Sequence, residues 1–172
     1  MAPPRSELKA RDHDPGRSLT ICALLGAEPG GGSLQRDTYF QGDRGRLKVR
    51  QEEGGGAHLF ADESLSLAGA HPRRWQFDIA QPEVLLETFE RTLGVEVVVV
   101  KHRRHLLWGE VRIHLDDVED LGCFLELQAE VPESSDPTLV RVRMDTLRLA
   151  LQIEDDDLVT ESYADLRLAV VA

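Results

Sequence analysis

The sequence is poor in cysteine, in long apolar runs and in net positive charge, and each shortage excludes a class of protein. Cys22 and Cys123 are too few and too far apart for a disulfide framework or a cysteine zinc site. No apolar run reaches membrane-spanning length, and the polar first residues do not form a secretory signal. The formal charge of −11 argues against a protein that binds nucleic acid or an anionic membrane through its surface. We therefore expect a soluble, cytoplasmic protein with no nucleic-acid or membrane partner.

The pattern of polar and apolar residues predicts one domain over residues 1–172, built mainly of short strands. Glycine and proline clusters predict loops at 28–33, 52–56 and 132–137. Residues 95–107 are apolar and then basic, and we expect this segment to turn back on itself. Alternating polarity predicts strands at 5–11, 36–40, 45–50, 58–62, 73–79, 109–115 and 123–131, and helical spacing predicts helices at 17–25, 82–93 and 139–153. This content is typical of an α+β protein with a mainly antiparallel sheet.

Charged side chains share one face of several predicted strands, because residues i and i+2 of a strand point the same way. Five sets of residues have this spacing, each within one strand: Arg46, Lys48 and Arg50; Arg5, Glu7, Lys9 and Arg11; Lys101 and Arg103; Arg112, His114 and Asp116; and Glu126, Gln128 and Glu130. One interpretation is an open sheet with a solvated charged face and no ligand. The other is a closed barrel whose polar interior binds a polyanion through basic groups and a divalent cation through carboxylates.

Four stretches of the sequence stand out in order along nearly the whole chain: SELKARD, RDTYFQGDRGRLKVRQEEGGGAHLF, GVEVVVVKHRRHLLWGEVRIHLDDVEDLGCFLELQAEV and DDDLVTESYADLRL. This ordered set resembles the motifs of the CYTH domains, or triphosphate tunnel metalloenzymes. That family includes class IV adenylate cyclases, thiamine triphosphatases and inorganic tripolyphosphatases. The resemblance implies a closed antiparallel eight-stranded β tunnel with flanking helices.

The resemblance also implies which residues form the site, although it assigns no catalytic residue. It implies that Mg²⁺ or Mn²⁺ is held by Glu7, Asp116 and Glu126. It implies that the triphosphate is held by Lys9, Lys48, Arg50, Lys101, Arg103 and Arg112. The bound partner would be a small molecule: ATP, tripolyphosphate or thiamine triphosphate. The oligomeric state is left open.

Three positions depart from the family pattern. Arg5 stands where the first glutamate of the N-terminal motif occurs in relatives. Gln128 replaces a glutamate that would be a charged metal ligand, and Ser64 replaces an arginine that would bind phosphate. A charge-assisted contact contributes roughly 1.5–3 kcal/mol. Losing two would lower affinity on the order of a hundredfold or more, unless a neighbour such as Arg73 or Arg74 compensates.

The branch resembled most closely predicts class IV adenylate cyclase activity, which converts ATP to cyclic AMP and pyrophosphate. Hydrolysis of tripolyphosphate or thiamine triphosphate is the alternative activity. The replacements at Gln128 and Ser64 leave a third possibility, a module that binds nucleotide or polyphosphate without turnover. His114 is a candidate hydrogen-bonding group, whereas His102 and His105 are expected to be solvated. The segment around Ser162, Tyr163 and Asp165 is expected to support the site.

Overall fold

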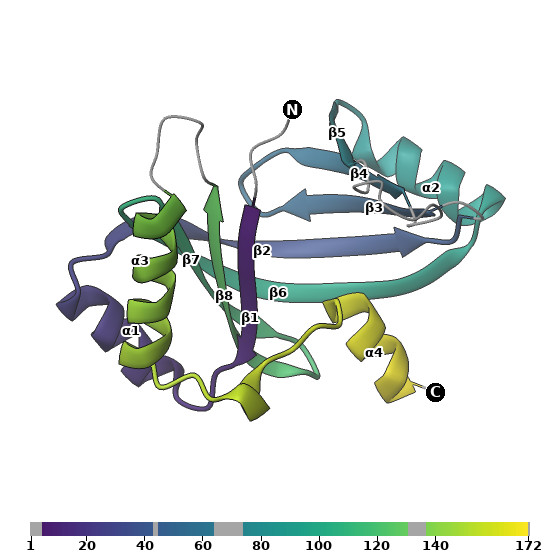
Figure 1. Cartoon of the computed structure of the whole chain (residues 1–172). Helices are drawn as coiled ribbons and strands as arrows, with labels where there is room; N and C mark the ends of the chain where they lie inside the picture. Colours follow the sequence, from purple (N-terminus) through teal and green to yellow (C-terminus); the bar gives the residue numbers. More distant parts are fainter. Residues whose placement is uncertain (1–4, 43–44, 64–73, 131–136, 172) are drawn as a thin grey trace. The chain divides into compact units, whose positions relative to one another are not determined.

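The structure, a computed structural model, describes residues 5–42, 45–63, 74–130 and 137–171 (Figure 1). Within these ranges no helix combines the length and the apolar character that crossing a membrane requires. The elements, in chain order, are β1 (Arg5–Arg11), α1 (Pro15–Leu24), β2 (Glu28–Phe40), β3 (Gly45–Glu52), β4 (Ala57–Glu63), β5 (Arg74–Ile79), α2 (Pro82–Thr92), β6 (Val95–Trp108), β7 (Val111–Val118), β8 (Gly122–Glu130), α3 (Pro137–Ala150), the 3₁₀ turn η1 (Asp155–Asp157) and α4 (Tyr163–Val171).

The strands form one eight-stranded sheet in the order β1-β8-β7-β6-β2-β3-β4-β5. Antiparallel ladders join β1 to β8, β7 to β8, β2 to β3, β3 to β4 and β4 to β5. The predicted α+β class and the eight-stranded antiparallel sheet of the tunnel fold are therefore confirmed. Ser64 and most of the predicted loop at 132–137 lie outside the described residues.

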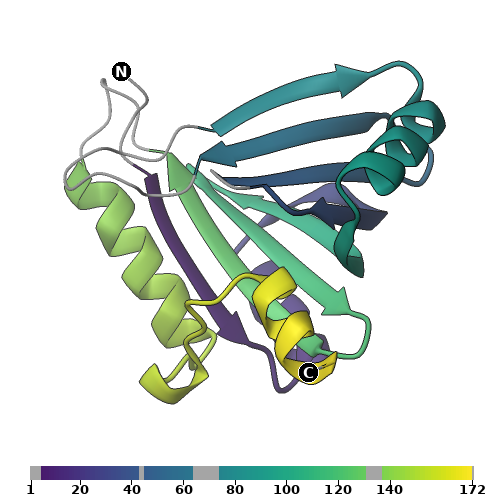
Figure 2. The same cartoon turned by 90° about the vertical axis from the view of Figure 1, so that its right-hand side faces the viewer.

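One compact unit comprises Met1–Gly32 and His102–Glu161. Helices α1 and α3 contribute Cys22, Val140 and Leu147 to its core, which packs them against Ile113 and Leu127 of the sheet. Helix α3 packs against β7 and β8 (Figure 2). Because apolar residues alternate along these strands, one face is buried under the helices and the other carries the charged residues.

The second compact unit comprises Ser33–Lys101 and Ser162–Ala172. Its strands β3, β4 and β5 follow one another as antiparallel neighbours. Helix α2 begins at a proline, which suits the first helical turn because the missing N–H has no partner to lose there. Its Phe89 ring meets Phe40 of β2 edge to face, with the ring centres 5.3 Å apart. This contact attaches α2 to the sheet.

The glycine-rich segment at 28–33, predicted as a loop, is instead the first part of β2. A Cβ atom on Gly30 would lie 3.3 Å from Cβ of His105, and one on Gly32 would lie 3.1 Å from the carbonyl oxygen of Arg103. The backbone of β6 therefore passes close to this segment. Glycine is used here for a close approach between strands, not for flexibility. In contrast, Gly54 lies in a turn between β3 and β4, as predicted.

The segment at 95–107 does not turn back; it is part of the 14-residue strand β6. The turn was predicted from the basic half of this segment, because lysine and arginine are rarely buried unless they are paired. Both Lys101 and Arg103 are buried, and both have carboxylate partners. The pairing allows the strand to continue through its charged half.

We expect Leu127→Ala to lower the free energy of unfolding by about 2–5 kcal/mol, because the leucine is fully buried and the substitution leaves a cavity. Leu149→Ala is the matched control, since Leu149 is 79% exposed on α3. Urea denaturation of both variants measures the difference. Equal losses would contradict the described core.

Candidate functional site

In the unit that comprises Ser33–Lys101 and Ser162–Ala172, three cationic side chains surround one buried carboxylate. Asp37 is 1% exposed and accepts two hydrogen bonds of 2.7 Å from Nε and Nη2 of Arg50. The Nζ atoms of Lys48 and Lys101 lie 3.5 Å and 3.6 Å from its Oδ2. Three cationic groups thus lie close to one carboxylate. We call Asp37, Lys48, Arg50 and Lys101 the basic cluster.

Strand register explains why these residues meet. Asp37 lies directly opposite Arg50 in the β2–β3 ladder, and Tyr39 lies opposite Lys48. Side chains of directly opposed residues project from the same face, so the alternating positions of both strands come together. Lys101 joins them from β6, the other neighbour of β2 in the sheet. The cluster therefore unites residues of three adjacent strands.

Burial shifts the proton affinities of this cluster. Burial alone would raise the pKa of Asp37, but the hydrogen bonds from Arg50 and the charges of Lys48 and Lys101 hold that pKa far below its ordinary value. Burial lowers the pKa of Lys48 to about 8; the negative charge of Asp37 opposes this change and the positive charge of Arg50 adds to it. Asp37 is thus a fixed anion, whereas Lys48 titrates near the physiological range.

Aromatic rings lie next to the cationic groups of the basic cluster. The Nζ atom of Lys48 lies 4.7 Å from the centre of the Phe60 ring and 5.6 Å from that of Tyr39. The Nζ atom of Lys101 lies 5.2 Å from the centre of the Tyr163 ring. Such contacts stabilise a desolvated cation without neutralising it. The rings therefore favour the charged forms of Lys48 and Lys101.

The segment from Ser162 to Asp165, expected to support the site, holds the next basic residue of β3. Asp165 accepts a 2.8 Å hydrogen bond from Nη2 of Arg46, and the Ser162 hydroxyl accepts one of 3.2 Å from Nη1. The Ser162 hydroxyl in turn donates to Asp165 over 2.6 Å. This arrangement lowers the pKa of Asp165, mainly through the hydrogen bond from Arg46. Helix α4 thus positions Arg46 beside the basic cluster on β3.

In the other unit, one arginine joins two buried carboxylates. Arg103 donates from Nε and Nη2 to the two oxygens of Asp116, over 2.7 Å and 2.5 Å. The same Nη2 donates to Oε2 of Glu126 over 2.7 Å. One guanidinium is thus shared by two carboxylates. We call Arg103, Asp116 and Glu126 the acidic cluster.

His114 lies beside the acidic cluster. The histidine is buried, and its Nδ1 lies 3.6 Å from Oε2 of Glu126 without a hydrogen-bond partner within the described residues. His105 meets it edge to face, with ring centres 4.9 Å apart. The expectation that His105 is solvated is therefore wrong, because it is half-buried against His114. His102 is exposed, as expected.

The nine residues that the resemblance implies are divided between the two units. Lys48, Arg50 and Lys101 form the basic cluster, and Asp116 and Glu126 meet in the acidic cluster. Arg103 contacts carboxylates within its own unit. Lys9 donates a 2.6 Å hydrogen bond to the carbonyl oxygen of Glu161. The remaining two residues, Glu7 and Arg112, are exposed and lie opposite Gln128 in their ladders.

The acidic cluster fits a divalent cation in the type of its donors. Carboxylate oxygens are ligands that suit Mg²⁺ and Mn²⁺. Yet both oxygens of Asp116 accept hydrogen bonds from Arg103, so a cation would compete with Arg103 for them. Across the described ranges, no group of three or more histidine, cysteine, aspartate or glutamate residues is placed to hold a metal.

The residue that sequence reasoning missed is Asp37. Asp37 lies in the RDTYF stretch, which contributes to the family resemblance but from which no role was predicted for Asp37. Alternation along 36–40 places Asp37 and Tyr39 on one face, and the same alternation places Lys48 and Arg50 on one face of 45–50. An acidic residue in a strand that pairs with a basic strand was therefore a usable signal.

Comparisons with known proteins agree on the family and the fold. A family model described as the CYTH domain matches residues 5–163. A Methanocaldococcus jannaschii protein named "putative adenylate cyclase" is 25% identical, and the match covers 94% of this chain and 97% of that protein. A solved structure from Pyrococcus horikoshii has a TM-score of 0.78 at 25% identity and covers 95% of this chain and 99% of that one. A third, a Vibrio parahaemolyticus protein named "putative adenylate cyclase", has a TM-score of 0.77 at 17% identity and covers 100% of both chains.

We expect Asp37→Asn to lower the free energy of unfolding by about 3–5 kcal/mol, because it leaves buried cations without their counter-charge. Asp78→Asn is the control, since the Asp78 side chain is 92% exposed and its ion pair with His58 lies at the surface. Chemical denaturation at neutral pH compares the two variants. A loss at Asp37 no larger than at Asp78 would contradict the role assigned to the buried carboxylate.

Proposed function

Because this chain belongs to the CYTH domain family, we propose that it is an enzyme that acts on a triphosphate with the help of a divalent cation. The observation that carries the proposal is the basic cluster. Its three cationic side chains lie among buried and half-buried groups, where an anion is attracted more strongly than in water. A polyphosphate is the small-molecule anion that matches several fixed cations at once.

The residues of the two clusters would contribute differently to the reaction. Lys48, Arg50 and Lys101 bind the phosphate oxygens and hold the chain of phosphates in one orientation. Glu126 and Asp116, with Glu7, are the residues that would hold Mg²⁺ or Mn²⁺. When bound, such a cation neutralises charge on the phosphate oxygens. The basic cluster is thus assigned to the negatively charged phosphates, and the acidic cluster is assigned to the positively charged metal ion.

Two reactions share this binding step. Attack by a ribose hydroxyl on the α-phosphate of ATP gives cyclic AMP and pyrophosphate. Attack by water on a terminal phosphate hydrolyses tripolyphosphate or thiamine triphosphate. The name of the Methanocaldococcus jannaschii relative, which matches along nearly its whole length, makes cyclisation our first expectation and hydrolysis the second.

The direct test is to incubate the protein with ATP, tripolyphosphate or thiamine triphosphate, with Mg²⁺ or Mn²⁺, and to measure cyclic AMP, pyrophosphate and phosphate. We expect turnover of at least one substrate, and we expect Glu126→Gln to reduce it about a hundredfold or more because a cation-binding carboxylate is lost. Lys48→Met should weaken binding about tenfold to a hundredfold, since one charge-assisted contact is removed.

The control variant is Glu119→Gln, because Glu119 is exposed and belongs to neither cluster. It should retain full activity. If tripolyphosphate binds but no substrate is turned over, the protein is a binding module and not an enzyme. Absence of both binding and turnover would overturn the proposal altogether.

The lowered pKa of Lys48 predicts a proton-linked binding step. In the free protein Lys48 is about half neutral near pH 8, and a bound polyanion favours its charged form. Binding of tripolyphosphate at pH 8 should therefore take up protons, and affinity should fall as the pH rises above 8. Calorimetry in two buffers of different ionisation enthalpy measures the uptake. Lys48→Met should abolish it, and uptake that persists in this variant would contradict the assignment.

A further inference from the structure

One ring nitrogen in the unit that contains the acidic cluster is buried without a hydrogen bond. The nitrogen is Nδ1 of His114, which has no hydrogen-bond partner within the described residues. The whole residue is 6% exposed. Burial of a polar atom without a partner destabilises a fold, so each case calls for an explanation, such as an ion that binds there.

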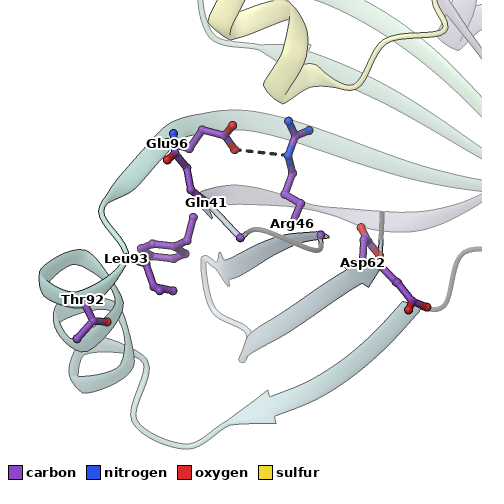
Figure 3. Close-up of a pocket in the computed structure, with 10 residues that line it drawn as sticks. Gln41, Arg46, Asp62, Thr92, Leu93 and Glu96 are labelled. Carbon is purple, nitrogen blue, oxygen red and sulfur yellow. Dashed lines mark ion pairs between the residues drawn. The ribbon is translucent and has the colours of Figure 1, made fainter. Parts of the chain in front are cut away.

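The charged side chains labelled in Figure 3, at a pocket of the other unit, differ from His114 in this respect. Nε of Arg46 lies 3.5 Å from Oε2 of Glu96, and the two side chains approach each other in the figure. Asp62 accepts a 2.5 Å hydrogen bond from Nε of Arg74. These groups have partners of opposite charge, whereas Nδ1 of His114 keeps a lone pair or a proton that no hydrogen bond uses in the described part of the chain.

Strand register brings His114 to the acidic cluster. His114 lies directly opposite Glu126 in the β7–β8 ladder, so the two side chains project from the same face. Nδ1 of His114 lies 3.6 Å from Oε2 of Glu126, which is too long for a hydrogen bond. Asp116 follows two residues later on β7 and shares this face. The ring of His105 packs edge to face against that of His114 and limits its rotation.

The separation of the two atoms suits one metal ion bound to both. With metal–ligand bonds of about 2.1 Å, neighbouring donor atoms lie about 3.0 Å apart at a right angle and about 3.4 Å apart at the tetrahedral angle. A shift of a few tenths of an ångström would therefore bring Nδ1 of His114 and Oε2 of Glu126 into this range. Oε2 also accepts a hydrogen bond from Arg103, but a carboxylate oxygen has two lone pairs and can bind both partners.

A nitrogen ligand changes which cation a carboxylate site prefers. Mg²⁺ is a hard ion that takes oxygen ligands, and imidazole suits transition-metal ions better. For a site with nitrogen and oxygen ligands, affinity rises from Mn²⁺ to Co²⁺ along the first transition row. Water and phosphate oxygens are ordinary ligands for the other positions of such an ion. Two protein donors are therefore enough to give the site a preference.

We propose that Nδ1 of His114 binds a divalent transition-metal ion directly, together with Glu126, and makes the site prefer such an ion to Mg²⁺. The inference rests on the proposed function, in which Glu126 is a cation-binding residue. It adds a nitrogen ligand to a site that the proposed function builds from carboxylates alone. It also chooses Mn²⁺ over Mg²⁺, two ions that the carboxylates leave as alternatives.

The first test observes the ligand. Mn²⁺ is added to an excess of the full chain in a buffer free of nitrogen and phosphate, and pulsed electron paramagnetic resonance detects an imidazole nitrogen bound to the ion. We expect the nitrogen signal in the wild-type protein and its loss in His114→Gln, because glutamine binds metals through its carbonyl oxygen. His102→Gln is the matched control, since His102 is an exposed histidine of β6, and it should keep the signal.

The second test measures selectivity. Calorimetry gives the affinities for Co²⁺, Mn²⁺ and Mg²⁺, and we expect them to fall in that order in the wild-type protein. His114→Gln should lower the affinity for Co²⁺ about tenfold to a hundredfold and that for Mg²⁺ less than about threefold. Thermal unfolding without metal shows whether this variant is folded. The wild-type nitrogen signal needs no variant and remains decisive if it is not.

Three results would overturn the inference. The first is Mn²⁺ bound to the wild-type protein without an imidazole nitrogen, and the second is a nitrogen signal that persists in His114→Gln. The third is an equal loss of affinity for Co²⁺ and Mg²⁺ in this variant, which would show that His114 only supports Glu126 or the fold. None of these results bears on turnover, so the assay with Glu126→Gln decides the proposed function separately. If the protein alone binds no Mn²⁺ and no Co²⁺, the inference also fails, and that assay again decides whether the proposed function fails with it.

Discussion

Burial of the Asp37 carboxylate is the constraint on which the rest of the site depends. A buried charge is costly unless it is paired and hydrogen-bonded. Asp37 meets this cost with two hydrogen bonds from Arg50 and with the nearby charges of Lys48 and Lys101. One carboxylate thereby holds cations of β3 and β6 on either side of β2.

Charged side chains are distributed unevenly in the protein, and the formal net charge does not show this. The whole sequence carries −11, yet three cationic side chains gather around Asp37, whereas two carboxylates gather around Arg103. Net charge therefore governs nonspecific binding at the surface. Recognition of a particular ligand depends instead on a few side chains that strand register brings together.

Local pattern predicted most elements because alternation and proline positions act over a few residues. The strand at 5–11 and the helix starting at Pro82 were obtained in this way. The errors at 28–33 and 95–107 share one cause: glycines and basic residues were judged by local preference. In the structure the backbone of β6 approaches Gly30 and Gly32, and carboxylates pair with Lys101 and Arg103. Both sets of contacts involve residues that are distant in sequence.

The sequence by itself determined the family, the fold class and the face of each strand that carries charge, since these follow from motif order and the two-residue period. Only the tertiary structure decided which charges meet. Lys101 and Arg103 are two residues apart in β6, but one contacts Asp37 and the other contacts Asp116 and Glu126. The period places a side chain on a face, whereas its partner is set by the register and order of strands far apart in the chain.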